Sequence, residues 1–268
     1  LVALRFVPTI SIGGGLDRVM PRWDARGGMQ RLGDGVVIAF AALFLLVPLT
    51  AVILRGLAGL PSMPTSVYHA AGVSISVAIA SIIVLLLLAL PMAGWIAERK
   101  AGGVEAVGLL GLSASPLMIG TGWFIVINPY ADPFDFALLV TVLVNAMMAL
   151  PFALRILVPP MREAVQRYGR LSTMLGLRGW ALWRVLLLPR LRAQIGFAAG
   201  LTGALSMGDL GVIALFADPD RVTLPLQMVR LMGAYRMDAA AGAALLLLGL
   251  SLGIFWICDK GGRWRAEA

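Results

Sequence analysis

The stretch "AAGVSISVAIASIIVLLLLALPMAGWIA", Ala70–Ala97, contains no charged residue. A helix needs about 20 mostly apolar residues to cross the roughly 30 Å hydrocarbon core of a bilayer. A segment that crosses lipid must also satisfy its own backbone hydrogen bonds, as an α-helix does. The stretch therefore predicts a transmembrane helix.

Five further segments of the chain have the same apolar character. They cover approximately residues 36–54, 106–127, 136–154, 193–216 and 239–258. Proline residues at positions 48, 91, 116 and 151 are expected to kink these helices, because proline removes a backbone donor and crowds the preceding turn. The sequence therefore predicts an all-α integral membrane protein whose six transmembrane helices occupy residues 35–260.

The composition supports this fold class and excludes several functions. Only 13% of the residues are charged, whereas a soluble domain has about 25%. The formal net charge is +8, but the basic residues lie in the connections between apolar segments, so no nucleic acid partner is expected. A single cysteine, Cys258, and a single histidine, His69, exclude an internal disulfide bond and a site with two histidine ligands.

The chain lacks the sequence patterns that bind ATP or catalyse hydrolysis. There is no Gly-x-x-x-x-Gly-Lys-Ser/Thr sequence, which excludes a phosphate-binding loop of that type. His-Glu-x-x-His and Gly-x-Ser-x-Gly are absent as well. We therefore expect no catalytic residue, metal or cofactor in this chain. An intramembrane enzyme, the alternative, would have to use His69 or Asp209.

The distribution of lysine and arginine predicts the orientation of the chain in the membrane. Residues 1–34 read as a glycine-rich linker with five arginines, and residues 155–192 carry eight arginines against a single acid, Glu163. The connections on the other side are nearly uncharged or balanced in charge. Because cytoplasmic loops are enriched in lysine and arginine, we expect both termini, including the tail 261–268, and the 155–192 loop in the cytoplasm.

The arginine-rich loop contains an apolar stretch that is unusual for a connection. Leu177–Leu188 would form about 18 Å of helix, which is too short to cross the bilayer. Trp180 and Trp183, interspersed with arginines, suit a helix that lies along the membrane interface. Pro159-Pro160 is expected to end the fourth span ahead of it. From composition alone, the loop is either such a helix or a basic connection that only sets topology.

The spacing within this loop resembles a motif of permease subunits from binding-protein-dependent ABC importers. That motif reads Glu-Ala-Ala, three residues, Gly, nine residues, then Ile-x-Leu-Pro. Here Gly176 is followed after nine residues by Leu186-Leu187-Leu188-Pro189, but Arg170-Leu171-Ser172 stands in place of Glu-Ala-Ala. The resemblance implies a short coupling helix that docks on a separate ATPase subunit, which would bind the ATP.

The residues that the motif assigns to this ATPase-coupling segment share one stretch of the loop. They are Arg170, Leu171, Ser172, Gly176, Leu177, Gly179, Leu186, Leu188 and Pro189. The absence of the family's glutamate leaves the details of ATPase docking open.

Four longer stretches extend the resemblance. "NAMMALPFALRIL" (145–157), "LGLRGWALWRVLLLPRLRAQIGFAAGL" (175–201), "SMGDLGVIALF" (206–216) and "TLPLQMVRLMGAYR" (223–236) resemble the C-terminal half of thiamine/thiamine-pyrophosphate ABC transporter permeases. That family is related to the iron(III) permeases. The likeness covers residues 140–258, weakens over 36–139 and is absent over 1–34.

The resemblance implies a fold, a function and partners. The fold would be the MetI-like transmembrane fold of type I importers, in the bacterial inner membrane. The partners would be an ATPase dimer, a periplasmic substrate-binding protein and a second six-helix half, either fused or a second copy. An iron(III) or other small-solute permease is the alternative within this class. A membrane scaffold without transport activity is the alternative outside it.

Two polar residues lie inside the predicted spans. Asp209, between Gly208 and Gly211, is either a pathway carboxylate that suits a cationic solute or the cap of a helix that restarts after a break. Asn145 would either line the path or bridge helices, because polar side chains hold membrane helices together. Both readings stay open at the level of the sequence.

Overall fold

The computed structural model describes residues 28–99, 102–177, 179–216 and 222–263. The chain divides into two compact units, Leu1–Thr50 and Ala51–Ala268. The described part of the first unit is the N-terminal portion of helix α1 (Gly28–Gly59), which contains Pro48. The predicted linker 1–34 lies mostly outside the described residues.

The second unit is built from helices. The long ones are α2 (Thr65–Arg99), α5 (Ala137–Met174), α8 (Arg192–Gly208) and α11 (Met237–Arg263). Shorter elements are η2 (Leu60–Ser62), α3 (Gly102–Leu109), η3 (Leu110–Ser113), α4 (Pro116–Ile127), η4 (Pro133–Phe136), α6 (Trp180–Leu182), η5 (Trp183–Leu187), α7 (Leu188–Arg190), α9 (Gly211–Phe216) and α10 (Leu224–Gly233). No strand occurs among the described residues, so the predicted all-α membrane fold is confirmed.

Five helical segments of the described chain are long and apolar enough to cross a membrane. They are Leu32–Ser62, Thr65–Glu98, Pro133–Met174, Arg192–Phe216 and Met237–Arg263. The segment predicted as the third span, 106–127, is not one helix. It is divided between α3, η3 and the shorter apolar helix α4. Pro116 explains the division, since Ser115 before it is extended (φ −80°, ψ 139°) and a proline starts a helix more readily than it continues one.

The prediction that Pro159-Pro160 ends the fourth span is wrong. Helix α5 runs through both prolines and continues to Met174. The prolines remove two backbone donors, but the helix beyond them keeps an apolar face on which Met161 and Ala164 are buried. Tertiary packing of this face offsets the lost hydrogen bonds, because most of the stability of helices in proteins comes from the packing of an apolar face. The fourth span and the start of the arginine-rich loop are therefore one continuous helix.

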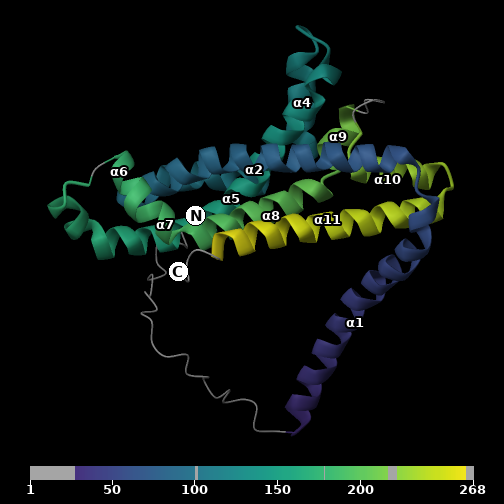
Figure 1. Cartoon of the computed structure of the whole chain (residues 1–268), viewed down its shortest axis with the longest axis horizontal. Coiled ribbons are helices and arrows are strands. Elements are labelled where there is room, and N and C mark those ends of the chain that lie inside the picture. Colours follow the sequence, from purple (N-terminus) through teal and green to yellow (C-terminus); the bar gives the residue numbers. More distant parts are fainter. Residues whose placement is uncertain (1–27, 100–101, 178, 217–221, 264–268) are drawn as a thin grey trace. The chain divides into compact units, whose positions relative to one another are not determined.

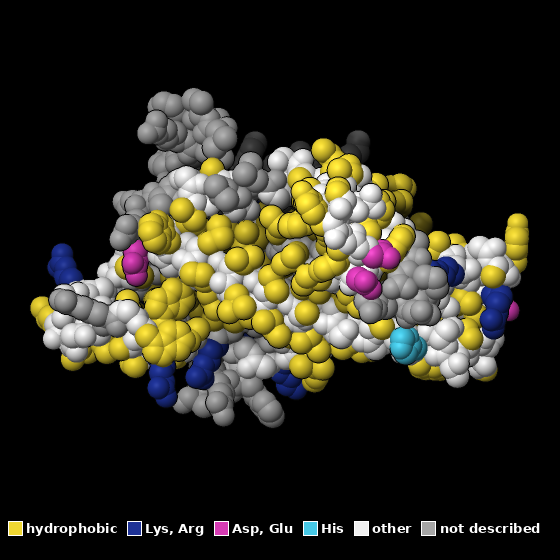
Figure 2. Space-filling view, turned by 90° about the horizontal axis from the view of Figure 1, so that it is seen from above, with side chains coloured by type: hydrophobic (Ala, Val, Ile, Leu, Met, Phe, Trp, Pro, Cys, Tyr) yellow, Lys and Arg dark blue, Asp and Glu magenta, His cyan; other side chains and the backbone are white. Residues whose placement is uncertain are grey.

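The core of the second unit lies where α2, α5 and α8 pack together (Figure 1). Many of its buried residues are small, including Ala89 and Ala93 of α2 and Ala146, Ala149 and Ala153 of α5. Small side chains let membrane helices approach closely, which increases their van der Waals contact. Outside this core, apolar side chains dominate the face seen in Figure 2, as expected for a surface in contact with lipid or other membrane helices.

Helix α8 also packs closely on α11, and glycines make this contact possible. A Cβ atom on Gly196 would lie 2.5 Å from the carbonyl oxygen of Cys258, and one on Gly200 would lie 2.8 Å from that of Phe255. The two helices therefore touch backbone to backbone. The ring of Phe197 meets the edge of Phe255 at 5.5 Å on the same seam.

Candidate functional site

The stretch that the motif assigns to ATPase coupling starts in the last turn of α5, which Gly176 ends, and the part after it, residues 176–190, is called the coupling segment below. The backbone N–H of Leu177 donates to the carbonyl of Ser172 (2.9 Å), and that of Gly176 donates to Thr173 (3.2 Å). This is the Schellman pattern, which needs a left-handed residue after the helix. Gly176 supplies it with φ +67°. The glycine that the motif places at this position is thus required by the backbone turn.

The coupling segment then forms a short helix with an irregular middle. Gly179 has φ +53°, and Trp180 to Arg190 follow as α6, the π-helical η5 and α7. Pro189 has no N–H to offer the carbonyl of Val185, four residues before it, which disfavours regular α-helical bonding there. Single π-turns within helices are frequent at functional sites. A short helix is therefore present where the sequence predicted one, but it is not a uniform α-helix.

The side chains of this short helix point in two directions. Leu187 is 1% exposed and packs into the core with Leu191, whereas Trp180 and Val185 are mostly exposed. The residues named by the motif are divided in the same way: Ser172 is buried, and Leu171 is half exposed. Leu187, the central anchor, occupies the variable position of the Ile-x-Leu-Pro pattern, so the motif did not single it out.

A second contact joins the end of the coupling segment to α5. The guanidinium carbon of Arg190 lies 4.0 Å from the centre of the Tyr168 ring. A cation at this distance over an aromatic face is attracted by the ring quadrupole. The continuation of α5 beyond its prolines thus carries the residue that holds the far end of the coupling segment.

Asn145 is part of a buried hydrogen-bonded chain between three helices. Its Nδ2 donates to Ser206 Oγ of α8 (2.9 Å), and Ser206 Oγ donates to Ser81 Oγ of α2 (3.4 Å). Ser81 Oγ in turn donates to the carbonyl of Val77 (2.8 Å). All three side chains are less than 9% exposed. The sequence indicated Asn145 but gave no signal for Ser81 and Ser206.

Replacing Asn145 with leucine is expected to lower the thermal stability of the protein in detergent. The change removes the donor to Ser206, and such bonds contribute about 0.6 kcal/mol in membrane proteins, with a maximum of about 1.7 kcal/mol. Ser76→Ala is the control, because Ser76 is on α2 but bonds only the Val73 carbonyl of its own helix at an exposed position. Equal melting temperatures for the two variants would contradict the bridging role.

Asp209 lies at a break between two helices. Helix α8 ends at Gly208, α9 begins at Gly211, and Asp209 itself is extended (φ −74°, ψ 125°). Its Oδ1 accepts a hydrogen bond from the backbone N–H of Gly211 (3.1 Å). Its Oδ2 is buried and has no hydrogen-bond partner within the described chain. One carboxylate oxygen therefore caps the helix that restarts at Gly211, and the other makes no hydrogen bond to the described residues.

Asn145 and Asp209 line the same cavity, which the coupling segment does not reach. The cavity measures about 410 Å³, within the range of about 300–1,000 Å³ that is usual for small-molecule pockets. Its lining includes Pro116, Asn145, Met148, Phe152, Ser206, Gly208 and Asp209. The described residues hold no group of three His, Cys, Asp or Glu side chains that could bind a metal.

Comparison with known proteins agrees with this architecture. No protein-family model matches the chain. The chain is 35% identical over its whole length to the thiamine transport system permease protein ThiP of Brucella abortus (strain 2308), of which it covers 51%. It is 33% identical over 86% of its length to the protein of the same name from Escherichia coli (strain K12), of which it covers 45%. Sulfate permease 2, chloroplastic, of Chlamydomonas reinhardtii is 26% identical over 92% of the chain, which covers 72% of that protein.

These similarities and the helical architecture define the class of protein. The chain has the all-helical transmembrane fold of ABC transporter permeases. It is homologous to thiamine transport system permeases and corresponds to their C-terminal half. The chain spans about half the length of the curated relatives it matches. The resemblance expected from the motifs is confirmed, although the match to the Brucella relative also includes residues 1–34, where no likeness was expected.

Proposed function

We propose that the chain is one transmembrane half of an ATP-driven importer of thiamine or thiamine pyrophosphate in the bacterial inner membrane. The observation that carries the proposal is the match of the whole chain to thiamine transport permeases at 35% identity. A separate ATPase dimer supplies the ATP hydrolysis, and a periplasmic binding protein delivers the solute. A second six-helix half completes the pore, since the chain covers 51% of that relative.

The coupling segment is the part that receives the ATPase in this proposal. ATP binding draws the two ATPase subunits together, and each would move the segment that is docked on it. Leu187 and Leu191 are buried among residues of α2 and α5, so a displaced segment must move its neighbours or lose this packing. Closely packed interfaces switch between discrete arrangements rather than deform gradually. The pore would thus alternate between states open to one side and to the other, with both termini and the coupling segment in the cytoplasm.

The cavity between Asn145 and Asp209 is our candidate for part of the solute path. It has a size suited to a small organic molecule, and its lining combines the polar side chains of Asn145 and Ser206 with apolar groups such as Phe152. Its acidic member, Asp209, is compatible with the fixed positive charge of thiamine. The hydrogen bond to Gly211 supports the helix-break role for Asp209 as the principal one.

Uptake of labelled thiamine tests the proposed function. The full permease, its ATPase and its binding protein are expressed together in cells that lack a thiamine transporter. We expect ATP-dependent uptake that requires all three components. Uptake of iron(III) instead of thiamine would support the related permease class. Absence of any associated ATPase on purification would support a membrane scaffold and contradict transport.

Two substitutions of Asp209 separate its proposed roles. Asp209→Asn keeps the oxygen that accepts from Gly211 and removes the charge, so we expect stability and thiamine uptake close to those of the wild type. Asp209→Ala removes the cap, which typically costs about 0.5–2 kcal/mol, and should lower both. Asp238→Asn, an exposed change at the start of α11, is the control. A large loss of uptake with Asp209→Asn and normal stability would contradict the helix-break role and indicate a pathway carboxylate.

A further inference from the structure

Gly94 of α2 provides a notch for the side chain of Trp183. A Cβ atom on Gly94 would lie 2.5 Å from Cζ2 and 3.1 Å from Cη2 of the Trp183 indole. Atoms at such distances overlap, so the indole rests where any other residue would place its side chain. Gly94 is itself buried. The first half of the coupling segment therefore lies directly against the backbone of α2.

The coupling segment is thus attached at three points along its length. Trp183 contacts α2 at Gly94, Leu187 is buried in the core, and Arg190 lies over Tyr168 of α5. A segment held in this way cannot move as a free loop. Its displacement must push or pull α2 at one end and α5 at the other.

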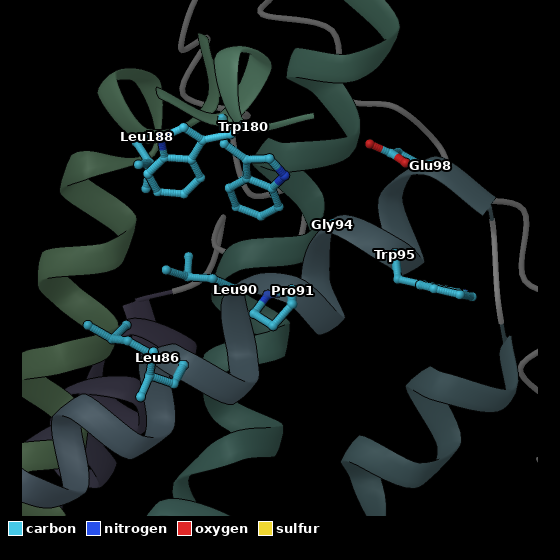
Figure 3. Close-up of a pocket in the computed structure, with 10 residues that line it drawn as sticks. Leu86, Leu90, Pro91, Gly94, Trp95, Glu98, Trp180 and Leu188 are labelled. Atoms are coloured by element: carbon cyan, nitrogen blue, oxygen red, sulfur yellow. The ribbon is translucent and has the colours of Figure 1, made fainter. Parts of the chain in front are cut away.

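Pro91 gives α2 a weak point one turn before the notch. Proline has no N–H for the carbonyl of Leu87, and helices bend most readily where such a bond is missing. A cavity of about 520 Å³ adjoins this point, and its lining includes Leu90, Pro91 and Gly94 of α2 and Trp180, Trp183 and Leu188 of the coupling segment. Figure 3 shows Trp180 and Leu188 of the coupling segment over the part of α2 around Leu90 and Pro91. The open space leaves room for the end of α2 to move relative to the segment.

Helix α2 also reaches the buried polar chain beside the candidate solute cavity. Ser81, which accepts from Ser206, lies 13 residues before Gly94, or about 20 Å along the helix axis. The same helix therefore carries the contact with the coupling segment and the hydrogen bonds of Ser206 to Ser81, and Pro91 lies between the two. A bend at Pro91 would change the direction of the end of α2 that carries Gly94 relative to the part that carries Ser81.

We propose that Trp183, seated in the Gly94 notch, is a positioning residue that transmits movement of the coupling segment to α2, with Pro91 as the hinge. The inference rests on the proposed function, because it takes ATP-driven motion of the segment as given. It adds a specific contact with α2 to the packing of Leu187 and Leu191 described above.

A pair of complementary substitutions tests the notch in the complete transporter, reconstituted in liposomes. Gly94→Ala should displace the indole, and Trp183→Leu should leave the notch partly empty. Each is expected to lower thiamine imported per ATP hydrolysed by roughly 2- to 30-fold, the range for residues that carry coupling between sites. The double variant should recover most of the loss, since the leucine leaves room for the new methyl group. Gly72→Ala, on the same helix and with no atom of the described residues within 4 Å of the added methyl group, should match the wild type.

Stimulation of ATP hydrolysis by the binding protein gives a second readout, which does not depend on the solute being thiamine. If the binding protein stimulates ATP hydrolysis by the wild-type transporter but no thiamine is imported, the proposed substrate is contradicted. The stimulation can still be compared between the wild type and the variants at Gly94 and Trp183, so the notch is tested in either case. The inference is overturned if Gly94→Ala and Gly72→Ala give the same values in both readouts. It is also overturned if adding Trp183→Leu to Gly94→Ala does not recover the lost coupling. Should Gly94→Ala fail to insert, Trp183→Leu alone decides, and unchanged coupling in that variant rejects the inference.

Discussion

Replacing Gly176 with valine is expected to reduce thiamine uptake to the level of cells that lack the ATPase, although the protein still inserts in the membrane. Gly176 has φ +67°, a conformation that costs an ordinary L-residue about 1–2 kcal/mol and a β-branched residue more. Relief of this strain would break the two bonds that end α5 and would redirect the coupling segment.

Gly176→Asn is the matched variant for this prediction. Asparagine adopts the left-handed conformation more readily than other residues with a side chain, so it should retain most of the uptake. No atom of the described residues lies within 4 Å of a Cβ atom on Gly176, so crowding among them does not explain a difference between valine and asparagine. Normal uptake by Gly176→Val would contradict the coupling role and favour a basic loop that only sets topology.

Replacing Gly196 with leucine is expected to prevent α8 from packing on α11. The added Cβ would lie 2.5 Å from the carbonyl oxygen of Cys258 and 2.9 Å from the Cα of Gly262. These are backbone atoms, which cannot rotate away, so the helices must separate. Overpacking of this kind usually costs about 1–3 kcal/mol or more. The amount of folded protein extracted from membranes and its melting temperature should both fall.

Gly249→Leu is the control for this contact. Gly249 is on α11, and a Cβ atom there would have nothing within 4 Å in the described structure. The control adds the same side chain to the same helix pair without a collision. Equal yields and melting temperatures for Gly196→Leu and Gly249→Leu would show that the seam between α8 and α11 does not limit stability.

Features that depend on local sequence were predicted best. The length of uncharged runs indicates the membrane helices, because the bilayer sets a minimum length for each span. Left-handed glycines are likewise a local requirement, so the motif identified Gly176. Its spacing to Pro189 also identified the short helix between them, but not the π-helical turn within it.

Features that depend on contacts between distant residues were not predicted. Proline normally ends a helix, so Pro159-Pro160 indicated a boundary, yet burial of Met161 on the far side keeps α5 helical. The notch between Gly94 and Trp183 joins residues 89 positions apart. Ser81 and Ser206 resemble any serine in an apolar helix until their partners are known. The cavity likewise results from the packing of several helices, and no single segment specifies it.

The unbroken course of α5 determines where an ATPase would make contact. A helix of 38 residues is about 57 Å long, whereas the hydrocarbon core is about 30 Å thick. If the helix stands parallel to the bilayer normal, roughly 27 Å of it extends beyond the hydrocarbon core into the headgroup region or water. The turn at Gly176 is at the far end of this helix, so the length of α5 sets how far from the hydrocarbon core the coupling segment begins and where a docking partner would meet it.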